Sequence, residues 1–394
     1  MTGHSSGVRW ADRAAPRVAL DDLAPTDGHD DQPGPAALQE ELAELLRSTA
    51  AVAAATDDGL RDHAAEAVSA LATPPGALGR LADLAVELAV IRGDLPPPIP
   101  QRATLIAAAG DHGVHVHGVT PWPQRVSALV ASTLAGGHAG ASAFANEAGA
   151  RTVVIDAGLV TPPAPAPRLV PARVVAGTRD LRTRDALSDG EVARAIVLGA
   201  RVTEAIVAEG GDLVAVGDLG IGNTTASAAL IAACADVDVR LVTGRGTGID
   251  DATLELKRRV VTDAVVRAGQ RDAAGYLAAF GGAEHAALVG VLLAAASHRI
   301  PVVLDGVIAC AAALVASRMS PGCREVMIAG HRSPEPGAGV VLEALGLHPL
   351  LDLELCLGEG SGALAAIPLV RIAARLLHDV ARLDEVLGGS PPER

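Results

Sequence analysis

The chain has 394 residues, enough for one large domain or two smaller ones, and a formal net charge of −14. This acidity disfavours nucleic-acid binding, which needs a basic surface, but it allows a single anionic metabolite, because backbone N–H groups bind phosphate without net positive charge. The chain is 49% hydrophobic and only 1% aromatic, so we expect a core of Ala, Val, Leu and Ile.

The N-terminal third changes character twice. Residues 1–35 are polar, rich in Asp, Pro and Gly, and contain no apolar h-region. They predict a disordered tail rather than a signal peptide, and we expect a cytoplasmic protein. Residues 36–95 contain amphipathic runs broken by TPPGALG, which predict the helical part of a smaller domain.

Five short β-rich runs follow, each ending in a turn that contains Gly or Asp. They span residues 103–113, 152–158, 213–223, 301–307 and 325–333. Ala-rich helical stretches lie between most of them, and residues 161–171 form a proline-rich connection. Strands that are apolar throughout and alternate with helices predict an α/β fold, with a doubly wound, mostly parallel, Rossmann-like sheet.

Residues 286–316 are apolar enough to raise the question of a membrane span. A spanning helix needs about 20 apolar residues with few charges. His298, Arg299, Pro301 and Asp305 interrupt this stretch. We therefore expect a buried helix, a turn and a buried strand, and no membrane association.

A metal site is the second question, because residues 108–119 hold three histidines near an aspartate. No carboxylate or thiol set completes the ligands in sequence. We expect His112 to be a hydrogen-bonding group in a cleft, and His115 and His117 to be lining or surface residues. The cysteines are far apart without a CxxC pair, and three of them lie in apolar runs, which favours buried thiols over zinc or disulfides. They are Cys234, Cys310, Cys323 and Cys356.

Polar side chains collect where the predicted strands end. Ligands of doubly wound sheets bind beyond the carboxyl ends of the strands. In this chain those ends carry Asp111, His112, Asp218, Asp305 and His331. The topology therefore predicts a binding site there.

The strongest local signal is GDLGIGNTTASAAL (217–230). An apolar strand runs into Gly220 and Gly222, then Asn223, Thr224 and Thr225 open a helix. The glycines let the backbone approach an oxyanion, and the helix start supplies free N–H groups. The run is neither a Walker A loop nor GxGxxG, and an ordinary turn with Asn and Thr capping explains it equally well.

A second glycine-rich turn, GRGTGIDD (244–251), precedes a helix that carries Lys257. Alone it indicates a flexible turn, and most helix lysines are simply solvated. Two such loops in one predicted sheet favour a sugar phosphate held between them.

LGEGSGALAAIPLV (357–370) places Glu359 between glycines, just before a long apolar helix. The flanking glycines leave the carboxylate open to a substrate, as a general base requires. From the chemistry alone, a charge that complements the helix dipole is the favoured alternative.

Seven motifs together resemble the nicotinate-nucleotide–dimethylbenzimidazole phosphoribosyltransferase family over roughly residues 70–380. In order they are PPGALGRL (74–81), AGDHGV (109–114), GDLGIGNTT (217–225), GRGTGID (244–250), LDGVIACAAAL (304–314), GHRSPEPG (330–337) and EALGLHPLLDLELCLGEGSGALAA (343–366). GIGNTT and LGEGSGA are the most specific.

The resemblance implies transfer of ribose 5-phosphate from nicotinate mononucleotide to 5,6-dimethylbenzimidazole, giving α-ribazole 5′-phosphate and nicotinate for the lower ligand of cobalamin. It implies Glu359 as the general base, no cofactor or metal, and a homodimer. We expect the phosphoribosyltransferase domain to span residues 96–355, with the catalytic loop and C-terminal helices at residues 356–394.

The resemblance also assigns roles to residues around the site. Phosphate and ribose contacts fall on Gly220, Ile221, Gly222, Asn223, Thr224, Thr225, Gly246, Thr247, Gly248 and Lys257. The strand-end argument gives polar cleft groups at Asp111, His112 and Asp218, and the resemblance supports Asp305 and adds Ser333. The base pocket falls on Ala77, Leu78, Leu219 and Leu357.

Four positions depart from the family pattern. Ala77 replaces a usual serine, Asp218 a glutamate, Ala338 a common histidine and Cys356 a common arginine. These changes bear on base identity more than on reaction type. Another benzimidazole, a purine or a phenolic acceptor is therefore an alternative, as is a non-catalytic relative that binds a nucleotide or base.

Overall fold

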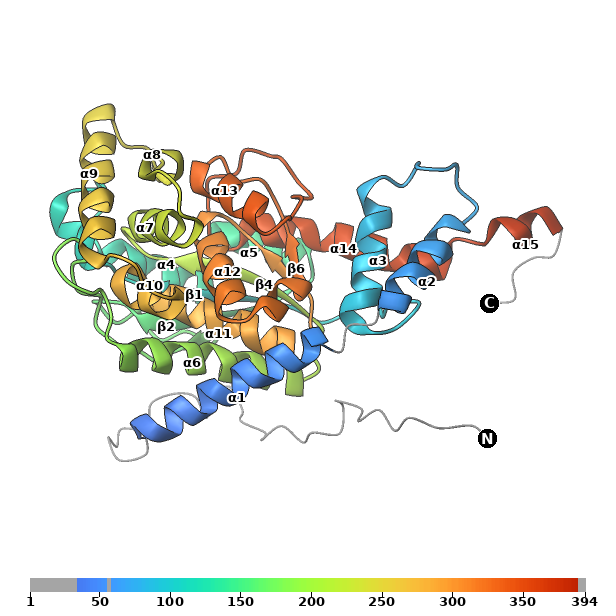
Figure 1. Cartoon of the computed structure of the whole chain (residues 1–394), viewed down its shortest axis with the longest axis horizontal. Helices are drawn as coiled ribbons and strands as arrows, with labels where there is room; N and C mark the ends of the chain where they lie inside the picture. The colour runs from blue at the N-terminus through green and yellow to red at the C-terminus, as the bar shows by residue number, and fades with distance from the viewer. Residues whose placement is uncertain (1–33, 55–57, 389–394) are drawn as a thin grey trace.

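A six-stranded, all-parallel sheet forms the centre of the protein, in a computed structural model that describes residues 34–54 and 58–388 (Figure 1). The strand order is β3-β2-β1-β4-β5-β6, and every pair is parallel. The strands are β1 Ala103–Gly110, β2 Arg151–Gly158, β3 Leu169–Val170, β4 Leu213–Leu219, β5 Val302–Leu304 and β6 Met327–Ala329.

The five predicted strands are confirmed as β1, β2, β4, β5 and β6. All eight residues of β1 and all seven of β4 are buried, as expected for central parallel strands covered on both faces. The short strand β3 was not predicted, because it lies inside the proline-rich connection. Two residues beside β2 are too few to give a periodic signal.

Helices cover both faces of the sheet. On one side α11 and α12 contact the strands and α6 packs on α11; on the other side α4, α5 and α14 contact them. The α-helices are α1 Pro35–Ala54, α2 Asp58–Ser69, α3 Arg80–Arg92, α4 Arg125–Ala135, α5 Gly140–Glu147, α6 Asp189–Ala208, α7 Asn223–Ala235, α8 Val239–Val242, α9 Asp251–Ala268, α10 Ala273–Phe280, α11 Ala283–Ser297, α12 Val307–Met319, α13 Pro336–Ala344, α14 Ser361–Asp379 and α15 Leu383–Gly388. Two 3-10 helices are η3 Gly113–His117 and η4 Pro321–Val326. The core consists almost wholly of Ala, Val, Leu and Ile, as predicted from the composition.

The helical segment at residues 36–95 is divided in space. Helices α2 and α3 pack on each other and on α14, away from the sheet (Figure 1). Helix α1 instead packs along α11, α6 and η4, on the main body of the protein. The expected tail at residues 1–35 lies, apart from its last two residues, outside the described residues.

The apolar stretch at residues 286–316 forms most of the buried helix α11, a turn, the buried strand β5 and the start of α12, as expected. Helix α14 is long and apolar enough to cross a membrane by length and composition alone. Half of that helix is buried, and it packs on α3, α5, β4 and β5, which accounts for its apolar residues as a core helix.

The strand order reverses direction between β1 and β4, which start the two halves of the sheet. Crevices at such a switch point, beyond the carboxyl ends of the strands, are where doubly wound proteins bind ligands.

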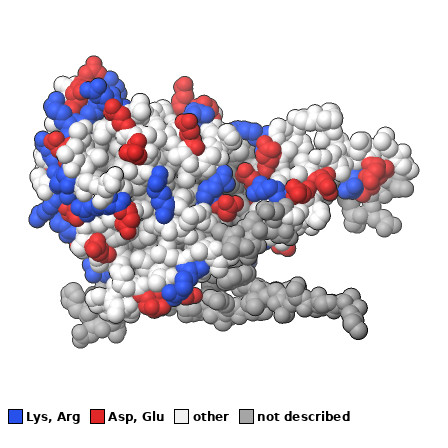
Figure 2. All heavy atoms as spheres, in the orientation of Figure 1, with Lys and Arg blue, Asp and Glu red and all other residues white. Residues whose placement is uncertain are grey.

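Acidic and basic side chains are interspersed over the face shown in Figure 2, with uncharged areas between them.

Candidate active site

A cavity of about 290 Å³ opens at the carboxyl ends of the strands. Its wall comes from the ends of β4, β5 and β6, from α4 and the residues before it, and from the loop that leads into α14. The lining residues are Trp122, Val126, Ser127, Val130, Asp218, Leu219, Gly220, Ile221, Asn223, Thr224, Gly246, Thr247, Asp305, Gly306, Val307, Ile308, His331, Ser333, Glu335, Leu355, Cys356, Leu357, Gly358 and Glu359.

The cavity brings together most of the residues proposed from the sequence. Those that line it are Asp218, Leu219, Gly220, Ile221, Asn223, Thr224, Gly246, Thr247, Asp305, Ser333, Leu357 and Glu359. Seven do not line it, namely Ala77, Leu78, Asp111, His112, Gly222, Thr225 and Gly248. Lys257 lies directly behind the wall and contacts it.

The first glycine loop (residues 220–225) joins β4 to α7. Gly222 has φ +97°, a left-handed conformation that a residue with a Cβ rarely adopts, and it caps α7. The N–H of Ile221 donates to Ser127 Oγ (3.0 Å), and the N–H of Thr225 donates to Gly222 O (3.0 Å). These bonds hold the loop in one shape and leave the start of α7, with Thr224, facing the cavity.

Lys257 supplies positive charge from behind this loop. Its Nζ donates to Thr224 Oγ1 (2.9 Å) and to Gly244 O (3.0 Å), so it ties the first glycine loop to the second (residues 244–251). Burial lowers the pKa of Lys257 to about 8, and the negative charge of Glu335 offsets part of this lowering. The ammonium therefore keeps its charge at neutral pH, next to a hydroxyl that lines the cavity.

Glu335 is a cavity residue that the sequence argument did not single out. Its Oε1 accepts the N–H of Gly246 (2.8 Å) in the second glycine loop. Glu335 lies two residues after Ser333 in GHRSPEPG, so the motif was noticed, but nothing in the sequence showed which of its side chains faces the cavity.

Glu359 lies in the part of the cavity wall that comes from the loop before α14. The residue is 9% exposed, and its Oε2 accepts the N–H of Ala141 (3.0 Å) near the start of α5. Burial raises the pKa of Glu359, the bond from Ala141 opposes this, and the charge of Asp305 adds to it. The carboxylate is thus poised to accept a proton more readily than an exposed glutamate would.

The backbone around Glu359 is unusual. Glu359 itself has φ +60°, a left-handed conformation that is uncommon for residues other than Gly, Asn and Asp. The loop approaches β4 so closely that a Cβ at Gly217 would lie 2.6 Å from the N atom of Gly360. Such strain persists only where surrounding contacts fix it, and it concentrates at functional sites.

Asp305 provides those surrounding contacts. Its Oδ2 accepts the N–H of Gly360 (3.0 Å), and its Oδ1 accepts the N–H groups of Gly362 (2.7 Å) and Ala363 (3.2 Å). The carboxylate therefore occupies the N-terminus of α14, where a negative charge is stabilised. Through these three bonds Asp305 fixes the backbone of the loop that carries Glu359.

Asp218 is a second carboxyl group in the cavity wall. Its Oδ2 accepts from Asn223 Nδ2 (2.8 Å), while Oδ1 has no hydrogen-bond partner among the described residues. Burial, and then the charges of Asp305, Glu284 and Glu359, raise the pKa of Asp218 well above its ordinary range. Asp218 therefore binds a proton more readily than an exposed aspartate does.

Asp111 and His112 do not reach the cavity, although they follow β1 as the strand-end argument required. Asp111 accepts from Ser127 Oγ (2.6 Å) and from the N–H of Val160 (3.0 Å). His112 is wholly buried against Glu284 (Nε2 to Oε1, 2.8 Å). Their partners lie on other elements, which no local pattern links to β1, and these contacts hold Asp111 and His112 out of the cavity lining.

The remaining histidines of residues 108–119 behave as surface groups. His115 Nε2 lies 2.9 Å from Trp122 O, and His117 Nε2 lies 3.0 Å from Asp180 Oδ2. Ala77 is exposed and Leu78 is half-buried, on the turn before α3, so this chain's own cavity does not use them.

One side of the cavity is apolar. Trp122 is 48% exposed there, beside Val126, Val130, Leu219 and Leu357. Only 1% of the chain is aromatic, so the rarity of tryptophan was the one feature of the sequence that could have pointed to Trp122. Apolar walls with a few convergent polar groups are typical of small-molecule sites.

A doubly wound sheet, a glycine loop at a helix start backed by a lysine, and a buried carboxylate facing an apolar wall define an α/β transferase acting on a phosphorylated metabolite. A family model described as Phosphoribosyltransferase matches residues 53–386.

Known proteins agree with this class. The nicotinate-nucleotide–dimethylbenzimidazole phosphoribosyltransferase of Salinispora tropica is 47% identical over 356 residues, covering 86% of this chain and 98% of that protein. The enzyme of the same name from Mycobacterium marinum is 43% identical over 331 residues, covering 83% and 92%. The crystal structure of CobT from Thermus thermophilus matches with a TM-score of 0.81 and 40% identity, over 85% of this chain and all of that one. The chain belongs to the nicotinate-nucleotide–dimethylbenzimidazole phosphoribosyltransferase family.

Proposed function

We propose that this protein transfers ribose 5-phosphate from nicotinate mononucleotide to 5,6-dimethylbenzimidazole. The main support for this proposal is that Glu359 and the first glycine loop line the same cavity. One end of that cavity offers N–H groups, hydroxyls and the charge of Lys257 for a phosphate. The other offers a carboxylate beside an apolar wall, which suits a flat base with one ionisable N–H.

The reaction follows from this division. The unprotonated nitrogen of the base attacks the anomeric carbon of the ribose, and the bond to the nicotinate nitrogen breaks with its electron pair. The configuration inverts from β to α, and the second base nitrogen, now acidic, gives its proton to Glu359. Anchoring the phosphate away from the reacting carbon fixes the geometry of attack, which supplies rate by positioning.

Asp305 and Ala141 support the proton transfer without taking part in it. Asp305 fixes the backbone on the helix side of Glu359, and the N–H of Ala141 orients the carboxylate. Asp218, in the position where relatives carry a glutamate, adds a second carboxyl group to the same wall.

We also infer a homodimer. Ala77 and Leu78, the base-pocket positions implied by the family motif, lie outside this chain's cavity, so only another copy could bring such residues to it. Trp122 (48% exposed) and Leu129 (61% exposed) present apolar surface near the cavity that a second copy would cover. Sedimentation equilibrium should give twice the chain mass of 39.5 kDa.

The test is nicotinate release from nicotinate mononucleotide with and without the base. Wild-type enzyme should release nicotinate and form α-ribazole 5′-phosphate, and Glu359→Gln should lower kcat by about 10²–10⁴-fold, the usual worth of a general base. Calorimetric binding of the nucleotide should survive. Unchanged turnover in Glu359→Gln would remove Glu359 from the mechanism.

A panel of bases resolves acceptor identity in the same assay. Replacing dimethylbenzimidazole by benzimidazole, adenine and phenol should reveal the acceptor with the highest kcat/KM. Turnover with a different base would keep the reaction class and change the substrate. Silence with every base, with nucleotide binding intact, would make the protein a binder and not an enzyme.

A further inference from the structure

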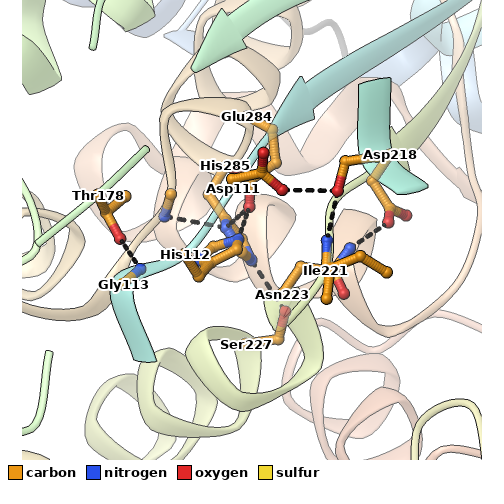
Figure 3. A network of polar contacts seen from close by, with 12 residues as sticks. Asp111, His112, Gly113, Thr178, Asp218, Ile221, Asn223, Ser227, Glu284 and His285 are labelled. Atoms are coloured by element: carbon orange, nitrogen blue, oxygen red, sulfur yellow. Dashed lines mark hydrogen bonds and ion pairs between the residues drawn. The ribbon is translucent and has the colours of Figure 1, made fainter. Parts of the chain in front are cut away.

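Three ionisable side chains that the proposed mechanism does not use are buried together behind the first glycine loop. His112 follows β1, while Glu284 and His285 lie in the first turn of α11, and all three are 0% exposed. Figure 3 shows them converging with Ser227 of α7. Buried charges and imidazoles are costly unless they are paired, so this cluster needs an explanation.

The contacts form one continuous chain across three elements. Glu284 Oε1 lies 2.8 Å from His112 Nε2 and 2.6 Å from His285 Nδ1. On its other side, His285 Nε2 lies 2.8 Å from Ser227 Oγ. The N–H of Gly282 donates to Nδ1 of His285 (3.2 Å), so Gly282, Glu284 and Ser227 all contact this one imidazole ring.

The ion pair at the centre is internally consistent. Burial opposes the charge on His112, but the neighbouring carboxylate outweighs it and raises the pKa of His112. Burial likewise opposes the charge on Glu284, but the two imidazoles outweigh it and lower the pKa of Glu284. A charged pair in the interior is held only by close partners, so its geometry is rigid.

The same three side chains would also suit a metal ion by residue type. Their distances argue for the ion pair. Ligand atoms that each lie about 2.0–2.2 Å from one metal ion in tetrahedral or octahedral geometry are separated by roughly 3 Å or more. The observed 2.6 and 2.8 Å are instead the separations of directly paired donors and acceptors.

The cluster adjoins the phosphate end of the cavity at two points. A Cβ at Gly222, the left-handed cap of α7, would lie 3.3 Å from the Cβ of His112, so His112 packs directly under the loop. Ser227 lies one helical turn after Asn223, on the same face of α7, and it is wholly buried. The network therefore contacts both the cap of α7 and its second turn, directly next to the cavity residues Asn223 and Thr224.

We propose that His112, Glu284 and His285 are positioning residues for the nucleotide phosphate, and that they act by fixing the start of α7 through Gly222 and Ser227. The proposal rests on the proposed function for its choice of ligand. It deepens that function by assigning affinity for the phosphate to side chains that never touch it. The base end of the cavity is not attached to this network.

Three variants separate the links. Ser227→Ala removes the hydroxyl on α7. His285→Asn keeps a polar group in the place of Nδ1 and loses the link to Ser227, whereas His285→Gln keeps a polar group in the place of Nε2 and loses the link to Glu284. Ser320→Ala is the matched control, because Ser320 is also buried but ends α12 away from the cavity.

Steady-state kinetics with both substrates give the main readout. We expect Ser227→Ala and His285→Asn to raise KM for nicotinate mononucleotide about tenfold, the effect of one lost buried hydrogen bond, with KM for the base unchanged. His285→Gln should recover most of the affinity, and Ser320→Ala should match the wild type. Equal KM values in all variants, or equal rises for both substrates, would overturn the proposal even if thermal stability falls.

Calorimetry with inorganic phosphate keeps the test independent of turnover. If the wild type binds phosphate and Ser227→Ala binds it about tenfold more weakly, the inference stands whichever base the enzyme uses. A protein that releases no nicotinate but shows this difference would sink the proposed reaction and not the positioning network. Stoichiometric Zn²⁺ or Co²⁺ retained after dialysis by wild type and lost in His285→Asn would instead make the cluster a metal site.

Discussion

Replacing Asp305 by Asn tests whether the loop of Glu359 is held from outside. Asp305 accepts three backbone N–H groups with two carboxylate oxygens. An asparagine whose single oxygen takes the place of Oδ1 keeps the bonds from Gly362 and Ala363. Its NH₂ group then faces the N–H of Gly360, donor against donor, so the bond next to Glu359 is lost.

The magnitude follows from that one bond. A hydrogen bond to a charged group contributes about 1.5–3 kcal/mol, and about 1.4 kcal/mol corresponds to a factor of ten. If this free energy fixes the position of the Glu359 carboxylate, Asp305→Asn lowers kcat by about 10- to 100-fold. KM for nicotinate mononucleotide should change little, because the phosphate end is held by other residues.

The assay is nicotinate release at saturating substrates, with thermal unfolding measured on the same preparations. The control is Asp263→Asn, which removes a carboxylate that pairs with Arg182 at the surface, where an ion pair contributes little. Asp263→Asn should stay within about twofold of the wild type. If Asp305→Asn loses thermal stability but keeps wild-type kcat, the contacts of Asp305 stabilise the fold and do not position Glu359.

Three further outcomes are expected. Because Lys257 loses its positive charge as the pH rises through about 8, kcat/KM for nicotinate mononucleotide should fall above that pH, and Lys257→Met should abolish this limb; a wild-type profile flat to pH 10 would contradict it. Because burial raises the pKa of Glu359 and only the ionised form accepts a proton, activity should rise with pH through a midpoint above 4.5, and the residual activity of Glu359→Gln should lack that rise. Trp122→Ala should raise KM for the base about three- to tenfold and leave KM for the nucleotide unchanged, as loss of an aromatic contact predicts; the reverse pattern would place the base elsewhere.

The sequence by itself determined the sheet, the ends of its strands and the glycine loops. These features are local, because a buried parallel strand is a continuous apolar run and the turn after it needs glycine or a capping side chain. The order of motifs added the family, and the resemblance implies that Glu359 is the general base. The sequence did not predict strand β3, because two residues at a sheet edge are too few to show a periodic pattern.

Only the tertiary structure decided which polar side chains face the cavity. Asp111 and His112 lie near the end of a strand, as Asp218 does, yet they do not line the cavity, because Asp111 pairs with Ser127 and His112 with Glu284 from other helices. The partners of Asp305, Lys257 and Glu335 likewise lie many residues away, on separate elements. Side-chain direction at a strand end depends on such long-range partners, and no spacing along the chain encodes them.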